Sequence, residues 1–553
     1  MTLRSYLEKN AAEIPSAAAL VYYGFDKAWH TDSWQTFLAD VTRTADVYGP
    51  SFNLKPQVEN TAIILPNSHI WMRAYLAQTG AGVSVVPIDP KLHDAEVAYI
   101  LKDSGAVVVT TDKAHLDMMR NIAANLPAVR AVVVVDHPHA TYEPIGNVPV
   151  HDFETLCERS SPGWFAAHVA KESDTASVIY TSGTTGKPKG AMLTHANFSQ
   201  DIEGALEVFD EEVTSADSLL VVLPLFHAFS FCTNFVLALY RGCTLKIVRS
   251  LYTIGEDIKT LKPSVVMSVP LLAEKMFDKI DAKLKASKLA QILMKVGLGG
   301  IVTKNIIKGL GGNLRFIIVG GAPCPKHILE GFRKLGIIML EGYGLTECSP
   351  VVSIAGPKCA KVGTIGVKIA NIDVRLADAN EQGVGELQVK GPITMKGYWH
   401  NEEATQDAFD GEWLKTGDLA SIDEDGLISI RGRKKALIVN REGKNIYPEE
   451  VENRIGADVL VADCVVVGYT TGGIPGEKVG CVVHPNEDAL ATLLPKDAPW
   501  ENVVKLVSDH VHAQCADLAD YKRVRKVKVV KEPLARTSIQ KVRRVAYKGS
   551  LDE

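Results

Sequence analysis

Residues 180–195, YTSGTTGKPKGAMLTH, combine three glycines and two lysines with five Ser or Thr hydroxyls. Glycine lets the backbone approach a ligand closely, consecutive N–H groups form a concave anion site, and lysine adds compact positive charge. An apolar run over 176–179 precedes the stretch and a helix is expected to begin near Thr194, which predicts a polyphosphate cradle between a strand and a helix N-terminus. The spacing is not that of a Walker A loop, and a flexible Gly/Ser linker is the competing interpretation.

Helix and strand patterns alternate on both sides of this stretch. Helical periodicity over 34–48, 70–79, 95–104 and 116–126 alternates with apolar strand patterns over 61–65, 83–87, 106–111 and 131–136. Strand patterns over 265–269, 316–319 and 337–340 continue the alternation, and short strands with turns follow Gly363. This order predicts the α/β fold class, with a large N-terminal domain of helix-covered parallel sheets and a β-rich subdomain.

The C-terminal residues form a separate pattern. A helix over 448–455, strands over 461–469 and 478–484, a helix over 500–516 and a strand over 524–530 predict a small α+β domain. The charged segment RGRKK at 431–435 is the expected boundary. We therefore predict an N-terminal domain over 1–432 and a C-terminal domain over 433–553.

Composition excludes several classes of protein. A chain of 553 residues is too long for one domain, and its net charge of −5 gives no basis for nucleic-acid binding. Nine cysteines are dispersed without a CxxC pair, which predicts reduced thiols in a cytoplasmic protein, and the N-terminus has no apolar run typical of a signal peptide. Residues 218–240 are uncharged when His227 is neutral, but Pro224 and several polar residues interrupt them. We expect a strand over 219–226 and a buried helix over 231–240 there, and no transmembrane span.

Five further segments stand out along the chain. They are LPLFH at 223–227, GGAP at 320–323, EGYGLTEC at 341–348, WLKTGDL at 413–419 and LARTSIQKVRR at 534–544. In this order, over nearly the whole chain, the six segments resemble the adenylate-forming superfamily, which includes acyl-CoA synthetases, firefly luciferase and the adenylation domains of peptide synthetases. The resemblance implies an enzyme that uses ATP and Mg²⁺ to convert a carboxylic acid into an acyl-adenylate, from which a thiol such as CoA displaces AMP. It also implies a mobile C-terminal domain that rotates between the two half-reactions.

The resemblance assigns roles to the residues that match the family motifs. The residues that would hold the β- and γ-phosphates are Thr181, Ser182, Gly183, Thr184, Thr185, Gly186 and Lys187. The backbone of Gly320, Gly321, Ala322 and Pro323 would lie against the adenine, and Tyr343, between Gly342 and Gly344, would stack on the purine or, alternatively, belong to the core. Thr346 would contact the α-phosphate, and Glu347 with Thr184 would coordinate Mg²⁺, which prefers oxygen ligands.

Several further roles follow from the same resemblance. Asp418 and Arg433 would bind the ribose hydroxyls or form an ion pair at the domain boundary. His227 would gate the acyl channel and approach the carboxylate, although a lone histidine in an apolar setting is also typical of a core residue. The nucleotide-binding set also includes Lys435, the expected pivot of the rotation, with Gly443 and Lys444.

Lys541 is the expected catalytic lysine, which would reach the α-phosphate and the attacking carboxylate. The family's common glycine before this lysine is Gln540 here, and its common proline earlier in the loop is Ala535. These departures change backbone freedom and leave the positive charge in place. The catalytic set is therefore Lys541, His227, Thr346 and Glu347.

The acyl substrate is suggested by the connection between Pro270 and Gly320. This connection of 49 residues is longer than is typical of family members acting on short or aromatic acids. Together with DGEWLKTGDL at 410–419 and GKNIYPEEVE at 443–452, it makes the chain resemble long-chain fatty acid–CoA ligases. From 275 to 308 there are eight lysines and two aspartates, with Leu, Ile and Met between them. That pattern fits either a surface on an anionic membrane or a solvated charged face.

The expected substrates are therefore a medium- or long-chain fatty acid, ATP and CoA. An acyl carrier protein as acceptor and an aryl or other acid as substrate are alternatives. A peptide-synthetase module would require a carrier domain, and an inactive nucleotide-binding regulator would require decay of the phosphate loop, of Glu347 or of Lys541. We expect a cytoplasmic monomer or homodimer that does not bind nucleic acid, with peripheral contact between 275–308 and the inner face of the membrane.

Overall fold

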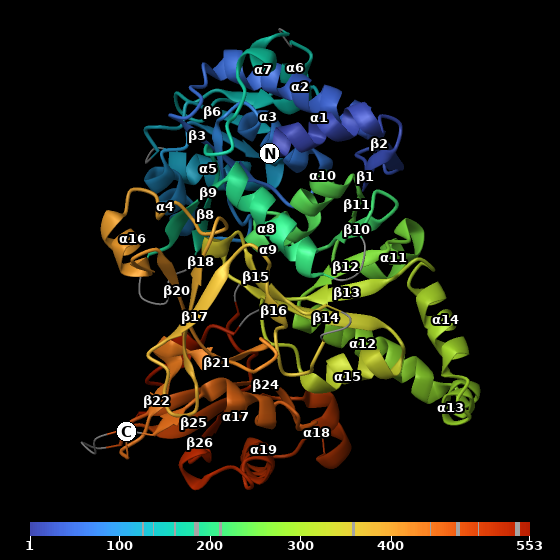
Figure 1. Cartoon of the computed structure of the whole chain (residues 1–553), viewed down its shortest axis with the longest axis vertical. Coiled ribbons are helices and arrows are strands. Elements are labelled where there is room, and N and C mark those ends of the chain that lie inside the picture. Colours follow the sequence, from blue (N-terminus) through green and yellow to red (C-terminus); the bar gives the residue numbers. More distant parts are fainter. Residues whose placement is uncertain are drawn as a thin grey trace. The chain divides into compact units, whose positions relative to one another are not determined.

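The computed structural model describes residues 1–123, 126–136, 138–159, 162–181, 187–209, 213–356, 360–442, 444–471, 476–495, 497–536 and 542–552 (Figure 1). The chain forms two compact units, one of Met1–Asp373 with Val389–Leu414 and the other of Val374–Gln388 with Lys415–Glu553. The second unit contains the predicted C-terminal domain 433–553 together with 374–388 and 415–432. A functional boundary at 432/433 stays a prediction.

The first unit contains a seven-stranded sheet in the order β7-β6-β5-β3-β4-β8-β9. Its neighbours are parallel except for β8 and β9, as the alternation of helices and strands predicts. The strands are β3 Asn60–Ile64, β4 Ser84–Pro87, β5 Val108–Thr111, β6 Ala131–Val134, β7 Val150–Asp152, β8 Thr175–Thr181 and β9 Lys189–Thr194. The intervening helices are α2 Trp34–Phe52, α3 His69–Thr79, α4 Asp94–Ser104, α5 Leu116–Ile122, α6 Phe153–Cys157 and α7 Trp164–Ala167. Apolar side chains of α4 and α5 pack on β3, β5 and β6 in one buried cluster.

A nine-stranded sheet, also in the first unit, follows the order β16-β15-β14-β13-β12-β10-β11-β1-β2. Its central strands are parallel, and antiparallel pairs form both edges. The strands are β1 Ala18–Tyr23, β2 Trp29–Ser33, β10 Ser218–Val221, β11 Thr244–Ile247, β12 Val265–Ser268, β13 Phe316–Val319, β14 Ile338–Gly344, β15 Val351–Ile354 and β16 Val367–Lys368. The helices of this part are α1 Leu3–Glu13, α8 His195–Val208, α9 Ala228–Ser230, α10 Leu237–Arg241, α11 Ile254–Leu261, α12 Pro270–Ala286, α13 Lys288–Lys295, α14 Gly299–Gly309 and α15 Lys326–Lys334.

Two predictions about local structure need correction, namely the connection after the phosphate loop and the length of the strand after Ser218. The phosphate loop does not run into a helix, because β9 pairs antiparallel with β8 and only then does α8 begin at His195, capped by Thr194. The loop therefore connects two strands of a hairpin. The strand predicted over 219–226 ends at Val221, before Pro224. The buried helix predicted over 231–240 is confirmed, although it begins with a π-helical turn, Phe231–Val236, before it continues as α10. Among the described residues no helix is long and apolar enough to cross a membrane.

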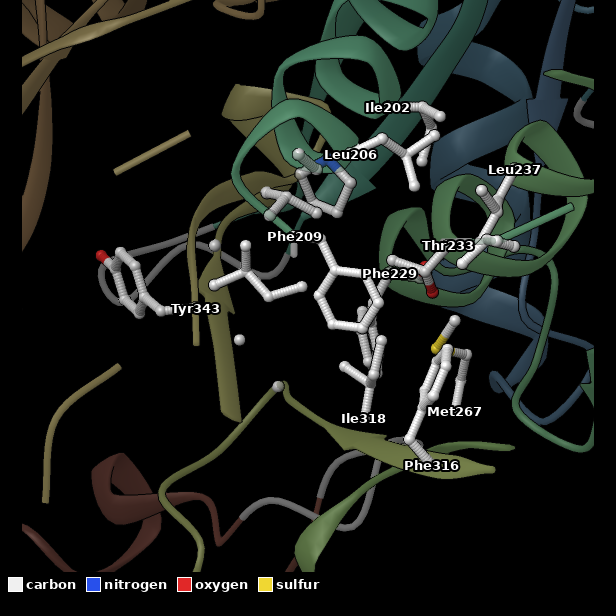
Figure 2. A pocket seen from close by; sticks show the side chains of 18 residues that line it. Ile202, Leu206, Phe209, Phe229, Thr233, Leu237, Met267, Phe316, Ile318 and Tyr343 are labelled. Atoms are coloured by element: carbon white, nitrogen blue, oxygen red, sulfur yellow. The ribbon is translucent and has the colours of Figure 1, made fainter. Parts of the chain in front are cut away.

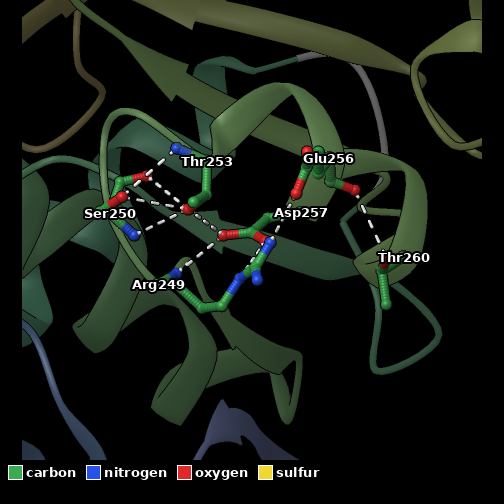
Figure 3. A network of polar contacts seen from close by, with 6 residues as sticks. All are labelled: Arg249, Ser250, Thr253, Glu256, Asp257 and Thr260. Atoms are coloured by element: carbon green, nitrogen blue, oxygen red, sulfur yellow. Dashed lines mark hydrogen bonds and ion pairs between the residues drawn. The ribbon is translucent and has the colours of Figure 1, made fainter. Parts of the chain in front are cut away.

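A buried carboxylate fixes the loop between β11 and α11 (Figure 3). The backbone N–H and the Nε–H of Arg249 donate to the two oxygens of Asp257, at 2.9 and 2.7 Å. Thr253 also donates its hydroxyl to Asp257, at 2.9 Å. Asp257 is fully buried, and these charge-assisted bonds compensate for its burial. The loop at this end of the sheet is thereby held in one conformation.

The second unit contains β-hairpin strands and a small α+β fold. Most residues of three strands belong to it, namely β17 Asp373–Ala377, β18 Gly385–Lys390 and β20 Trp413–Ile422. It also contains β21 Ile428–Arg433, β22 Ile438–Val439, β23 Asn445–Ile446, β24 Val461–Tyr469, β25 Lys478–Pro485 and β26 Lys526–Val529. Helices α17 Pro448–Ile455 and α19 Trp500–Gln514 pack on the sheet β24-β25-β26, and α18 spans Glu487–Leu493. The helix and strands predicted from 448 onward are confirmed. The short elements α16 Glu402–Ala408 and β19 Phe409–Asp410 belong to the first unit.

Candidate active site

An apolar cavity lies against β12, β13 and β14 of the first unit (Figure 2). The space between its walls, together with the solvent at its mouth, is about 750 Å³. Helix α8 and the segment after His227 supply Leu206, Phe209, Phe229 and Thr233 to its wall. The full lining is Ile202, Ala205, Leu206, Phe209, Val213, Phe229, Thr233, Leu237, Met267, Phe316, Ile318, Gly321, Gly342, Tyr343, Gly344, Pro350, Val351 and Ile354. The structure thus brings together the predicted adenine-binding residues and an apolar pocket.

Two glycine motifs allow close backbone approach beside this cavity. Gly321 has φ +82, in the left-handed region that favours glycine. A Cβ on Gly320 would lie 3.1 Å from the Phe229 ring and 3.2 Å from the Gly342 carbonyl oxygen. At Gly344 a Cβ would lie 1.7 Å from the Pro350 carbonyl oxygen, which no other residue can accommodate without a backbone shift. Gly320 therefore allows the GGAP loop to approach Gly342, and Gly344 allows the chain to pass close to Pro350.

Glu341 connects these two loops and was given no role by the sequence. It pairs in register with Val319 at the end of β13, and its Oε1 accepts the Cys324 N–H at 3.4 Å. Burial raises the pKa of Glu341 to about 7. The carboxyl therefore anchors the turn that follows GGAP to the strand that carries Tyr343.

Glu347, the predicted Mg²⁺ ligand, lies beside the end of the phosphate loop. Its Oε1 accepts the Tyr398 hydroxyl at 2.9 Å and faces the Thr181 hydroxyl at 3.4 Å. Burial and the adjacent Glu347 carboxylate raise the pKa of Tyr398, so this hydroxyl stays protonated and donates. Tyr398 was missed by the sequence analysis, since it is 51 positions from Glu347 and belongs to no segment singled out there.

The residues present fit a magnesium ion held jointly with a nucleotide. Glu347 offers a carboxylate oxygen and Thr181 a hydroxyl, the hard oxygen donors that Mg²⁺ prefers. Among the described residues no three His, Cys, Asp or Glu side chains cluster to hold a metal ion. Such a donor set suits a cation that takes its remaining ligands from phosphates and water.

Backbone hydrogen bonds tie Glu347 to strand β9. The Met395 N–H donates to the Glu347 carbonyl at 2.9 Å, and the Lys396 N–H donates to the Met192 carbonyl at 3.0 Å. The Trp399 N–H donates to the Gly190 carbonyl at 2.7 Å. The segment 395–399 therefore bridges the metal ligand and the strand that leaves the phosphate loop.

The phosphate loop itself is described only at its two ends. Lys187 lies with its Nζ 5.5 Å from the centre of the Tyr99 ring, and Lys189 lies 5.0 Å from that of Tyr398. Both cations thus flank the loop on aromatic surfaces. The predicted phosphate ligands Ser182, Gly183, Thr184, Thr185 and Gly186 lie outside the described residues, so the predicted role of Thr184 as a Mg²⁺ ligand stays a prediction. Gly443 and the catalytic candidate Lys541 also lie outside them.

His227 precedes the cavity wall. Burial lowers the pKa of His227 to about 4, and the Asp89 carboxylate opposes this shift, so the imidazole is neutral near pH 7. Phe229 and Thr233, which follow it, line the cavity, and Thr233 donates its hydroxyl to the Phe229 carbonyl at 2.7 Å. Within the described part of the chain His227 is not among the lining residues. Its role at the carboxylate stays a prediction.

The predicted ribose ligands form an ion pair within the second unit. Asp418 is buried on β20, and the Arg433 Nε lies 2.7 Å from its Oδ1 in a directly opposed pair of strands. Lys435 is exposed in the turn that follows. Lys444 pairs with Glu442 at 2.9 Å. The ion-pair alternative for Asp418 and Arg433 is confirmed, and their binding of ribose stays a prediction.

Comparison with known proteins identifies the family. A model of the family described as AMP-binding enzyme matches residues 7–399. The chain belongs to the AMP-binding enzyme family. The long-chain-fatty-acid–CoA ligase FadD15 of Mycobacterium bovis is 32% identical to this AMP-binding enzyme over 450 residues, 74% of this chain and 71% of the relative.

Other relatives of this AMP-binding enzyme carry different names. The feruloyl-CoA synthase of an Amycolatopsis species is 29% identical over 426 residues, 74% of this chain and 75% of the relative. Among solved structures, ATP-bound MatB from Rhodopseudomonas palustris has a TM-score of 0.78 at 24% identity, covering 99% of both chains, and shows the same fold. The α/β fold with parallel sheets is therefore confirmed.

Proposed function

We propose that the protein joins a medium- or long-chain fatty acid to CoA by way of an acyl-adenylate, releasing AMP and pyrophosphate. The observation that carries the proposal is the apolar cavity against β12–β14, which shares Gly321, Gly342 and Tyr343 with the predicted adenine site. A carboxylate at the mouth of this cavity would lie beside the nucleotide while its alkyl chain is buried. The relatives named as long-chain-fatty-acid–CoA ligases support the same acid class.

The lining favours an alkyl chain over a hydroxylated aryl acid such as the substrate in the name of the Amycolatopsis relative. The polar side-chain atoms on the described wall are the hydroxyls of Thr233 and Tyr343. Thr233 already donates to the Phe229 carbonyl. A ring hydroxyl buried deep in the cavity would therefore lose water without gaining a good partner, which costs free energy.

The chain's own residues would divide the work as follows. Glu347 and Thr181 would hold Mg²⁺, which neutralises phosphate charge when bound. The backbone around Gly321 and Gly342 would position the adenine, and neutral His227 would gate the acyl channel and approach the carboxylate. Lys541 would place its ammonium at the α-phosphate during adenylation.

The two half-reactions would be separated by rotation of residues 433–553 about Lys435. Exposure of Lys435 in a short turn is compatible with a pivot, since its side chain makes no buried packing contact. Lys435→Pro would fix φ at this position. We expect it to slow thioester formation from supplied acyl-adenylate and to spare pyrophosphate exchange; equal loss of both would contradict a pivot at this residue.

A chain-length series tests the acid class. With CoA, ATP and Mg²⁺ fixed, kcat/KM should rise from acetate toward dodecanoate and hexadecanoate, by at most about fourfold for each buried methylene, since each contributes about 0.8 kcal/mol. Coumarate and ferulate should be poor substrates. A preference for acetate or for coumarate would overturn the fatty-acid assignment, and replacing CoA by an acyl carrier protein in the same series distinguishes the two acceptors.

A further inference from the structure

Helix α13 carries an apolar face that the rest of the described chain leaves uncovered. Leu289, Ile292 and Val296 follow one another at helical spacing at positions i, i+3 and i+7, and their exposed fractions are 67%, 56% and 61%. Leu298, which directly precedes α14, and Ile301, in the first turn of α14, are 50% and 48% exposed. Helix α13 has no buried residue. Several large apolar side chains exposed together, unlike single ones, mark an interaction surface.

The helices on either side hold α13 in place. On α12, the Phe277 ring packs against Phe332 with centroids 5.5 Å apart. On α14, Val302 is buried and the Thr303 hydroxyl donates to the Leu335 carbonyl at 2.6 Å. Figure 1 shows α12, α13 and α14 as an arm with α13 at its tip. The apolar face is therefore presented by an anchored support and does not fold back on the core.

The charge around this face is of one sign. From 282 to 312 the sequence has six lysines and no acidic residue. All six, at 283, 285, 288, 295, 304 and 308, are exposed, and of these Lys285 is paired, with Asp281 at 2.7 Å. Lys288 and Lys295 lie at the two ends of α13, beside the apolar face. An apolar stripe with lysines along its borders is complementary to the anionic surface of a lipid bilayer, with its apolar layer beneath charged headgroups.

We propose that the α13 face, defined as Leu289, Ile292, Val296, Leu298 and Ile301 with its bordering lysines, docks the protein on an anionic membrane. A second copy of the chain is a poorer occupant, because a two-fold contact through this face would place lysines opposite lysines. The proposal concerns binding to lipid and holds whatever acid the active site takes. Docking would also bring the protein to the phase into which long-chain acids partition.

Co-sedimentation of the full chain with vesicles tests the proposal, in roughly 0.1 M salt where the screening length is about 10 Å. The wild type should pellet with phosphatidylcholine vesicles that contain phosphatidylglycerol and much less with phosphatidylcholine alone. Replacing Leu289, Ile292 and Val296 together by Gln should lower the partition coefficient at least tenfold. Lys288→Glu with Lys295→Glu should remove the preference for phosphatidylglycerol.

A matched control replaces three exposed apolar residues elsewhere, Val58, Val169 and Leu251, which are 72%, 61% and 59% exposed, by Gln. This variant should sediment like the wild type. Both triple variants should keep wild-type activity on a soluble short acid, which shows that they fold. Wild-type binding by the α13 variant, or equal binding to both lipids, would overturn the proposal. Sedimentation velocity that finds a wild-type dimer and a monomeric α13 variant would also overturn it, because a second copy would then cover the face.

Discussion

Removal of one hydroxyl should weaken magnesium binding at the active site. Tyr398→Phe deletes the donor that lies 2.9 Å from the Glu347 Oε1 and leaves the aromatic ring in place. The ring can still face Lys189, whose Nζ lies 5.0 Å from its centre. Thr181, at 3.4 Å, is the weaker remaining contact of the same oxygen. The variant therefore isolates the effect of one charge-assisted hydrogen bond on the proposed metal ligand.

Two known energetic effects give the expected rise in the Mg²⁺ requirement of Tyr398→Phe. A hydrogen bond to a charged group contributes about 1.5–3 kcal/mol, equivalent to a factor of roughly 10 to 150 in an equilibrium constant. Loss of a residue that orients a metal ligand typically lowers metal affinity about 10- to 100-fold. We therefore expect the Mg²⁺ concentration for half-maximal activity to rise about 10- to 100-fold in Tyr398→Phe.

The assay is ATP–pyrophosphate exchange titrated with free Mg²⁺, together with calorimetric titration of ATP at fixed Mg²⁺. Excess Mg²⁺ should restore most of the exchange rate. Tyr142→Phe is the matched control, because Tyr142 is also a partly buried tyrosine and its hydroxyl has no hydrogen-bond partner within the described chain. An unchanged Mg²⁺ requirement in Tyr398→Phe, or a lost rate that no Mg²⁺ concentration restores, would refute the role assigned to this hydroxyl.

Three further predictions concern the packing of Gly344, the burial of Glu341 and the role of Lys541. Gly344→Ala should lower the free energy of unfolding by about 3 kcal/mol in urea denaturation, because its Cβ would lie 1.7 Å from the Pro350 carbonyl oxygen. Gly342→Ala should change the free energy of unfolding little, because the nearest atom to its Cβ would be 3.7 Å away. Equal effects of the two substitutions would contradict the close packing at Gly344. Burial raises the pKa of Glu341 from 4.5 to about 7, so folding favours its protonated form, and this contribution is present below pH 4.5 and lost as the pH rises toward 7. Relative to Glu341→Gln, the wild type should therefore lose up to about 3 kcal/mol of unfolding free energy across that window, and a parallel pH dependence of the two proteins would show that the carboxyl is not desolvated. Lys541→Ala should abolish pyrophosphate exchange but spare thioester formation from supplied acyl-adenylate, and loss of the second step alone would remove Lys541 from adenylation.

Much of the fold could be predicted because its signals are local. Apolar residues at strand or helix spacing predict β3 to β6 and α2 to α5 within a few residues, and the alternation alone implies parallel sheets. The pairing of strands that are distant in the sequence leaves no such local signal. Strand β9 was taken as part of a loop, since its partner β8 and its contacts with 395–399 are visible only in three dimensions.

Residues of the candidate site could be predicted where their segment resembles a known family, and not where they stand alone in the sequence. The glycine motifs, Tyr343 and Glu347 could be located because their segments resemble a known family, and the structure brings Gly321, Gly342 and Tyr343 to one cavity. Tyr398 could not be located, because nothing in the spacing connects a single aromatic residue with a carboxylate 51 positions away. The uncovered apolar face of α13 likewise requires knowledge of what the rest of the chain buries.

Product analysis of a complete reaction tests the central claim most directly. The protein is incubated with ATP, Mg²⁺, hexadecanoate and CoA, and the nucleotide and thioester products are quantified by chromatography. The account predicts AMP and hexadecanoyl-CoA in equal amounts, with AMP release strongly stimulated by CoA. Formation of ADP, or AMP release without any acyl thioester, would contradict it.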